Sequence, residues 1–179
     1  MGKPLIIFLA VSLSGAASGP AWAQIPVSSW QTIDVDPRFT IQMPAPVERA
    51  VDTDGDGTRT SDFSFWFADV NSFSVTITDY ADDADADADP ASALLAAQNA
   101  LVATFPGAAQ GSEDPVRHAS HPGRAFSIRY DGGNRFYRAL LVVFRPSGSL
   151  VHLAVDVDDG DAADPSIDRF FGSFAIRKD

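Results

Sequence analysis

Apolar and polar residues alternate along much of the chain, and the alternation is clearest over 72–79. There Phe73, Val75 and Ile77 fall on one side of an extended backbone, while serine and threonine residues occupy the positions between them. A period of two residues is typical of a β-strand with one buried and one solvated face. The same pattern recurs in the segments 39–43, 63–67, 124–130 and 150–157. Such strands in succession predict an antiparallel sheet.

Segment 135–145 differs, because apolar residues occupy both of its faces from Ala139 onward. A strand that is apolar on both sides is buried on both sides, so we predict that this segment lies in the centre of the sheet. Turn sequences bound it, with Asp-Gly-Gly-Asn at 131–134 and Pro-Ser-Gly at 146–148.

Two helices are predicted by a capping residue followed by proline. Asp89 precedes Pro90, and apolar residues from there to about Phe105 form one helical stripe. Asp164 and Pro165 repeat the arrangement near the C-terminus. Strands in runs with two separate helices favour an α+β fold over alternating βαβ units. We therefore expect an α+β fold with an antiparallel sheet of about six to seven strands.

The first 23 residues match a cleavable secretory signal peptide. Lys3 precedes an apolar run over 5–13, which is too short to span a bilayer because a spanning helix needs about 20 apolar residues. The sequence Ala-Trp-Ala at 21–23 places small side chains at the two positions that a signal peptidase reads. We expect cleavage before Gln24, a single domain over 24–179, and a periplasmic or secreted location.

Charge and cysteine content limit the partners of this domain. The chain carries a net charge of −11, and loss of Lys3 with the signal peptide makes it −12. This charge repels nucleic acid and anionic lipid, so we expect no nucleic-acid partner and no membrane insertion after signal cleavage. The chain has no cysteine, so packing must hold the core without disulfides. Cations and basic partners remain compatible with the charge.

Three short segments resemble small bacterial exported domains with a PsbP-like fold. Segment 168–174 ends in Phe-Phe-Gly-Ser-Phe, similar to their Phe-x-x-Ser-Phe ending. Phe39–Pro44 is similar to their Phe-x-Val-x-x-Pro strand, and His121–Phe126 resembles their glycine-centred entry to a long hairpin. The resemblance implies an antiparallel sheet flanked by helices in an α/β/α sandwich. It implies little about function, because members range from photosystem assembly factors to a Ran-binding factor and the matching positions are core and turn positions.

One local motif points to a metal. Segment 52–57 reads Asp-Thr-Asp-Gly-Asp-Gly, like the first half of a calcium-binding loop. In such a loop the carboxylates of Asp52, Asp54 and Asp56 converge on one calcium ion. The second half departs from the pattern, since Phe63 stands where a bidentate glutamate is needed. The alternative interpretation is an Asp/Gly turn at a hairpin tip.

Other polar groups suggest chemistry less specifically. Acidic residues gather in the segments 82–89 and 156–164, where they form either solvated loops or, if the fold joins them, a divalent-cation site. His118, His121 and His152 offer three zinc ligands if they converge. Five arginines predict either an anion site or ion pairs with the acidic loops: Arg124, Arg129, Arg135, Arg138 and Arg145.

The sequence contains no catalytic motif that we recognise. It has no Gly-x-Ser-x-Gly nucleophile elbow, no cysteine nucleophile and no phosphate-binding or dinucleotide loop. We therefore favour an exported, non-enzymatic binding or accessory protein whose partner is an unknown protein or small molecule. A calcium-responsive domain that uses the Asp52–Asp56 loop is the alternative, and an unrecognised hydrolase is a further one.

Overall fold

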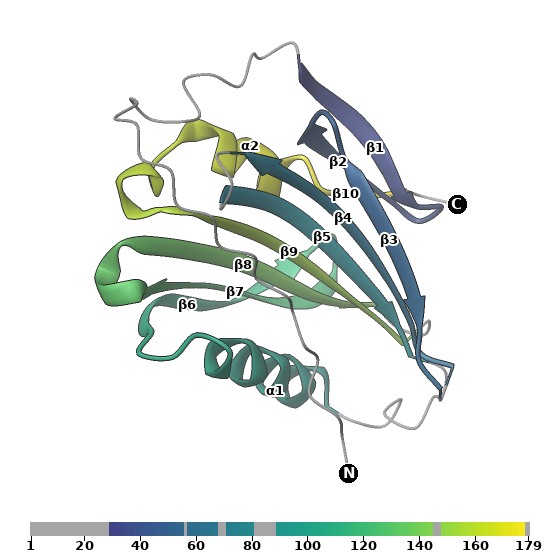
Figure 1. Cartoon of the computed structure of the whole chain (residues 1–179). Helices are drawn as coiled ribbons and strands as arrows, with labels where there is room; N and C mark the ends of the chain where they lie inside the picture. Colours follow the sequence, from purple (N-terminus) through teal and green to yellow (C-terminus); the bar gives the residue numbers. More distant parts are fainter. Residues whose placement is uncertain (1–28, 56, 68–70, 81–88, 145–147, 178–179) are drawn as a thin grey trace.

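A seven-stranded antiparallel sheet forms the centre of the molecule. The computed structural model describes residues 29–55, 57–67, 71–80, 89–144 and 148–177 (Figure 1). The strands are β3 (Glu48–Thr53), β4 (Arg59–Phe67), β5 (Asn71–Asp79), β6 (Ala109–His118), β7 (His121–Tyr130), β8 (Arg135–Phe144) and β9 (Ser149–Asp158). Their order across the sheet is β3-β4-β5-β9-β8-β7-β6. The predicted signal peptide lies outside the described residues.

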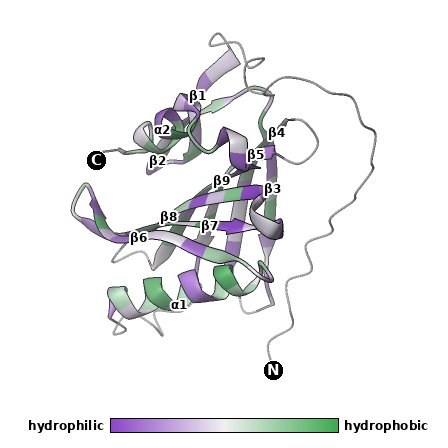
Figure 2. Cartoon of the chain, turned by 90° about the vertical axis from the view of Figure 1, so that its left-hand side faces the viewer, coloured by the Kyte–Doolittle hydropathy of each residue, from purple (hydrophilic) through white to green (hydrophobic). Residues whose placement is uncertain are grey.

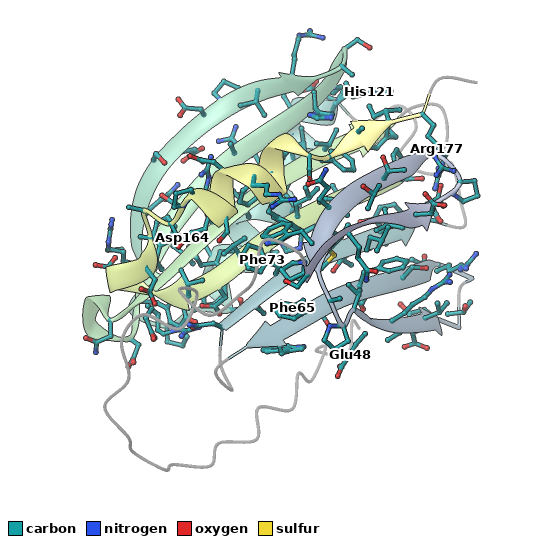
Figure 3. All side chains as sticks on the ribbon, turned by 90° about the horizontal axis from the view of Figure 1, so that it is seen from above. Glu48, Phe65, Phe73, His121, Asp164 and Arg177 are labelled. Carbon is teal, nitrogen blue, oxygen red and sulfur yellow. The ribbon has the colours of Figure 1, made fainter. Side chains whose placement is uncertain are left out.

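A smaller sheet and a short helix cover one face of the large sheet. The smaller sheet pairs β1 (Trp30–Asp36), β2 (Phe39–Pro44) and β10 (Ala175–Ile176) in the order β1-β2-β10, and the helix α2 spans Pro165–Gly172. Figure 3 shows these elements lying over the large sheet. The two layers enclose the larger core, which includes Phe39, Ile41, Met43, Phe63, Phe65, Phe73, Val75, Ile77, Val151, Leu153, Val155, Val157, Ile167, Phe170 and Phe174.

Helix α1 covers part of the opposite face. It spans Pro90–Ala103, and its cap is the predicted one, since the Asp89 carboxylate accepts hydrogen bonds from the backbone N–H groups of Ala91 and Ser92. The helix packs against β7 and β8 (Figure 2). The second core lies at this contact and includes Leu94, Phe126, Ile128, Tyr137, Ala139, Leu141 and Ala154. No helix within the described residues has the length and apolar character needed to cross a membrane.

The observed architecture confirms the α+β class and the antiparallel sheet, whereas the helix-flanked sandwich matches only in part. α1 lies on one face, but the other face carries the small sheet as well as α2. Segment 39–43, which we expected in the main sheet, forms the small sheet instead. Its apolar side packs onto the face of the large sheet, where the rings of Phe39 and Phe144 lie 4.4 Å apart. Segment 135–144 is central as predicted, between β7 and β9.

Gly123 explains the glycine-centred segment in structural terms. It lies on β7 opposite Val142 of β8, and a Cβ atom at this position would come within 2.7 Å of the Leu141 carbonyl oxygen. A side chain there would force the two strands apart, so the glycine serves close strand packing. The motif that carries the resemblance is therefore a structural one.

Candidate functional site

The candidate site is the part of the sheet that α1 leaves uncovered. Along β5, Phe73, Val75 and Ile77 point into the larger core, so Ser74 and Thr76 point to the opposite face. α1 packs over β7 and β8 on that face and leaves the side chains of β3, β4 and β5 partly or fully exposed. We call these side chains the open face: Glu48, Ala50, Asp52, Thr60, Asp62, Ser64, Trp66, Ser74, Thr76 and Thr78.

Hydroxyl groups line the middle of the open face. The register of β4 and β5 places Thr60 opposite Thr78 and Ser64 opposite Ser74. Each hydroxyl group can donate one hydrogen bond and accept others. Threonine and serine therefore suit an exposed face of a strand, and their hydroxyl groups can still form hydrogen bonds with a ligand.

The open face carries one exposed aromatic side chain, Trp66, and three carboxylates. The Trp66 side chain is 55% exposed, and its indole Nε1–H donates to Ser64 Oγ at 3.2 Å. The carboxylates of Glu48, Asp52 and Asp62 share this face by register. None of the ion pairs found within the described residues involves them. The face therefore combines a flat aromatic surface with uncompensated negative charge.

A buried polar cluster borders the open face on the neighbouring strands. Arg135 on β8 donates to Asp156 at 2.6 Å, to Asp158 at 2.9 Å and to the side-chain oxygen of Asn71 at 2.7 Å. The hydroxyl group of Tyr130 donates to the same Asp156 carboxylate, at 2.7 and 2.8 Å from its two oxygens. These contacts join β5, β7, β8 and β9. Within the described residues only the buried side-chain nitrogen of Asn71 in this cluster has no hydrogen-bond partner. The other contacts join its members to one another, so the cluster fixes these strands.

Burial shifts the acid–base behaviour of this region. It raises the pKa of Asp156 above its ordinary value and raises the pKa of Tyr130 to about 12. It also lowers the pKa of His152 to about 4. His152 Nε2 lies 2.8 Å from the hydroxyl oxygen of Tyr137. His152 is therefore neutral near pH 7 and adds no positive charge beside the open face.

The predicted calcium loop lies at the β3–β4 hairpin. The Asp52 side chain accepts a hydrogen bond from the Thr53 N–H at 2.8 Å, and the backbone N–H of Asp54 donates to the Thr58 carbonyl at 2.8 Å. Asp56 lies outside the described residues, within which no group of three or more potential metal ligands is found. Strands flank the loop, so it is not a helical calcium hand. Calcium binding by the three aspartates stays a prediction, which a calorimetric calcium titration tests.

The three histidines do not form one zinc site. His118 and His121 pair across the β6–β7 hairpin, and the His121 ring stacks on Phe144 of the larger core, with 4.4 Å between ring centroids. His152 points to the opposite face of the sheet, where it meets Tyr137. The sheet itself separates the two groups.

Four of the five predicted arginines form ion pairs, which favours the second interpretation of that group. The pairs are Arg124 with Glu113, Arg129 with Asp159, Arg135 with Asp156 and Asp158, and Arg138 with Asp168. Arg145 and residues 82–88 of the first acidic group lie outside the described residues. Asp89 of that group caps α1, and the second acidic group supplies three of the five ion-pair partners.

Ser173, in the C-terminal motif, is a structural residue. Its hydroxyl group donates to the Phe170 carbonyl at 2.8 Å and accepts from the Gln42 N–H at 2.9 Å. These bonds close the end of α2 and join it to β2. Ser173 therefore serves packing in this tail.

Sequence reasoning missed the buried polar cluster. The signal was present, since Tyr130 and Arg135 flank the turn at 131–134 and therefore pair across the hairpin. Asp156 and Asp158 alternate with valines on the strand that turned out to lie beside it. The sequence does not show that β8 and β9 are neighbours. The pair Tyr130 and Arg135 therefore could not be assigned to one cluster with Asp156 and Asp158.

Comparison with known proteins identifies the fold. No protein-family model matches the sequence, and no curated protein matches it significantly. Among solved structures, cyanobacterial PsbP (CyanoP) from Synechocystis has a TM-score of 0.58 at 15% identity, over 86% of this chain and 96% of that protein. The chain therefore has a PsbP-like fold, as the short motifs indicated.

Two further structures are similar at a lower level. A Pseudomonas aeruginosa protein of unknown function has a TM-score of 0.49 at 11% identity, over 84% of this chain and 99% of that protein. The Ran-binding protein Mog1p from Saccharomyces cerevisiae has a TM-score of 0.49 at 11% identity, over 82% of this chain and 95% of that protein. At these identities the likeness concerns fold and not site chemistry.

Proposed function

We propose that the domain is an exported binding or accessory protein and that its partner docks on the open face. The observation that carries the proposal is Trp66, whose large side chain is 55% exposed on a polar sheet face, near the end of β4. Exposed aromatic residues surrounded by polar groups are typical of recognition surfaces, where they supply contact area at a small cost in conformational entropy. The neighbouring hydroxyl and carboxylate groups would orient the partner.

A binding role fits the polar groups nearby better than a catalytic one. The strongest acid–base candidates, Asp156 and Tyr130, are hydrogen-bonded to each other and to Arg135. A general base must reach a substrate proton directly or through one water molecule. The proposal therefore assigns no catalytic residue and rests on the open face as a contact surface.

Export is the second part of the proposal and rests on the N-terminal pattern. The apolar run over 5–13 and the small residues at 21–23 favour cleavage before Gln24. We expect the mature protein to begin at Gln24 and to be recovered from the periplasm or the medium. N-terminal sequencing by mass spectrometry checks this, and an uncleaved chain in the cytosolic fraction would contradict it.

The docking surface is tested with two variants that each remove one exposed apolar side chain. Leu95 on α1 is 42% exposed and does not belong to the open face, so it is a control for Trp66. We expect a partner cross-linked to the mature protein in periplasmic extract to be lost with Trp66→Ser and retained with Leu95→Ser. A partner that survives Trp66→Ser would refute docking on the open face.

A further inference from the structure

The two edges of the large sheet differ in how they are protected against pairing. β6 contains Pro115, and its register to β7 shifts between Gln110 and Glu113. Proline and bulges are devices that keep an edge strand from accepting another strand. β3 has neither device, since its six residues pair with β4 in one unbroken register and all six are exposed. β3 is therefore the edge that can accept a further strand.

The side chains of β3 are sorted by charge between the two faces of the sheet. The register places Glu48 opposite Ser64 and Asp52 opposite Thr60, so both carboxylates lie on the open face. Arg49 and Val51 alternate with them and point to the other face, and the Val51 side chain is 49% exposed. An incoming strand would meet two carboxylates on one of its faces, and Arg49 and the apolar Val51 on the other.

Trp66 lies on the open face just beyond the paired residues of β3. Continuing the register beyond Glu48 and Ser64 places Trp66 one pair further along the open face. An arginine or lysine side chain can stack on an exposed indole ring. Figure 3 places Glu48 at the outer edge of the large sheet, where an added strand would lie.

The carboxylates of β3 determine which kind of strand can pair with it. A second copy of β3 that paired antiparallel around Ala50 would place Glu48 opposite Asp52, and like charges directly opposite each other are destabilising. A basic strand would instead place opposite charges at both positions. The net charge of −11 also attracts a basic segment over longer distances.

We propose that β3 receives an extended basic segment of a partner protein as an added antiparallel strand. Its basic residues stand four positions apart, opposite Asp52 and Glu48, and an apolar residue faces Val51. This inference rests on the proposed docking function and names the chemistry of the partner. Main-chain hydrogen bonds supply affinity in this mode of binding, and the alternating side chains supply specificity.

The probe follows from the register. We use a fluorescein-labelled heptapeptide, Lys-Val-Thr-Glu-Lys-Thr-Arg, in which the two lysines face Asp52 and Glu48, the valine faces Val51, and the arginine reaches Trp66. A control peptide of the same composition, Val-Lys-Thr-Lys-Glu-Thr-Arg, moves the lysines to the other face. Fluorescence anisotropy gives the Kd of each peptide for the mature protein.

We expect the first peptide to bind at least about tenfold more tightly than the control, and its affinity to fall between about 50 mM and about 300 mM salt. Glu48→Lys should weaken its binding by at least about tenfold, and Asp62→Lys should weaken it in the same direction. Asp114→Lys, at an exposed position on β6, should change the Kd less than about twofold. Circular dichroism checks that each variant is folded.

Amide hydrogen exchange locates the bound peptide, and slower exchange in β3 with no change in β6 would support the added strand. Equal binding of both peptides, an unchanged Kd in Glu48→Lys, or protection confined to β6 would each overturn the inference. So would sedimentation showing a dimer that Glu48→Lys dissociates. If the peptide fails but the cross-linked partner still depends on Trp66, the added strand is wrong and docking on the open face stands. If that partner survives Trp66→Ser, the proposed function fails.

Discussion

The two halves of the large sheet have the same antiparallel backbone geometry, but their polar side chains lie in different surroundings. In the half formed by β6, β7 and β8, α1 covers one face, and arginines meet acidic partners. In the half formed by β3, β4 and β5, hydroxyl and carboxylate groups stand on an uncovered face without ion pairs among the described residues. The ion-paired half of the sheet and the open face that we propose for docking therefore lie side by side in one sheet.

The position of α1 decides which outward-facing residues of the sheet remain exposed. α1 contains no charged residue, and its buried Gln98 accepts a hydrogen bond from Arg124 of β7 at 2.6 Å. That bond and the apolar contacts of Leu94 hold the helix over β7 and β8. The outward side chains of the strands beyond its reach stay partly or fully exposed.

The largest expected effect comes from loosening α1. Leu94 is buried between the helix and the sheet, so Leu94→Ala should lower the free energy of unfolding by about 2–5 kcal/mol through lost burial and a residual cavity. Leu95→Ala on the exposed side of the same helix should cost less than about 1 kcal/mol. Urea unfolding of both variants measures the difference. Equal losses would show that α1 is not packed as described.

Acid should weaken the molecule through His152. Its pKa is lowered to about 4 by burial, whereas an unfolded histidine titrates near its ordinary value of about 6.5. Between those values the unfolded chain binds more protons, so stability falls as the pH falls, by up to about 3 kcal/mol. The raised pKa of Asp156 acts in the opposite direction at lower pH. His152→Gln should flatten the pH dependence of Tm between about 6.5 and 4, and an unchanged slope would contradict the assignment.

Removing one charge from the buried polar cluster should come next in size. Asp156→Asn leaves Arg135 with Asp158, whose side chain is largely exposed, and should cost about 2 kcal/mol of unfolding free energy. Asp159→Asn breaks the more exposed pair with Arg129 and should cost no more than about 1 kcal/mol. Chemical unfolding compares the two. A larger loss for Asp159→Asn would reverse the contrast between buried and exposed pairs.

The smallest effect on stability is expected where the effect on binding is greatest. Trp66→Ser removes an exposed side chain from the open face and should change the free energy of unfolding by no more than about 0.5 kcal/mol. Differential scanning calorimetry of this variant, beside the partner cross-linking, separates contact loss from unfolding. A marked drop in Tm would mean that Trp66 contributes to the core and not to a surface.

The strands could be predicted because each carries its own alternation. Phe73, Val75 and Ile77 fall on the core side as the sequence pattern indicates, and Asp89 and Asp164 cap the two helices. The separation of the small sheet could not be predicted, because periodicity shows which side of a strand is buried and not which strand lies beside it. The order of the strands is a property of non-local contacts.

The candidate site was accessible from the sequence only in part. The solvated side of β5 was predicted, but that pattern does not say whether water, a helix or a partner covers it. The alternation over 63–67 puts Trp66 on the side of its strand opposite the phenylalanines, and only the position of α1 shows that α1 leaves this side exposed. The buried cluster around Arg135 depends on strand neighbours that lie far apart in sequence, such as Asn71 and Arg135.

The order of strands also has a consequence for how the chain folds. β3, β4 and β5 form one run of neighbours and β6 to β9 form another, and the two runs meet only at β5 and β9. At this seam Asp79 and Ser149 are 70 residues apart in sequence, and their side chains are joined by a hydrogen bond. Closing so long a loop slows folding. We expect substitutions at the seam to slow the folding rate most, whereas substitutions at the two edges should chiefly accelerate unfolding.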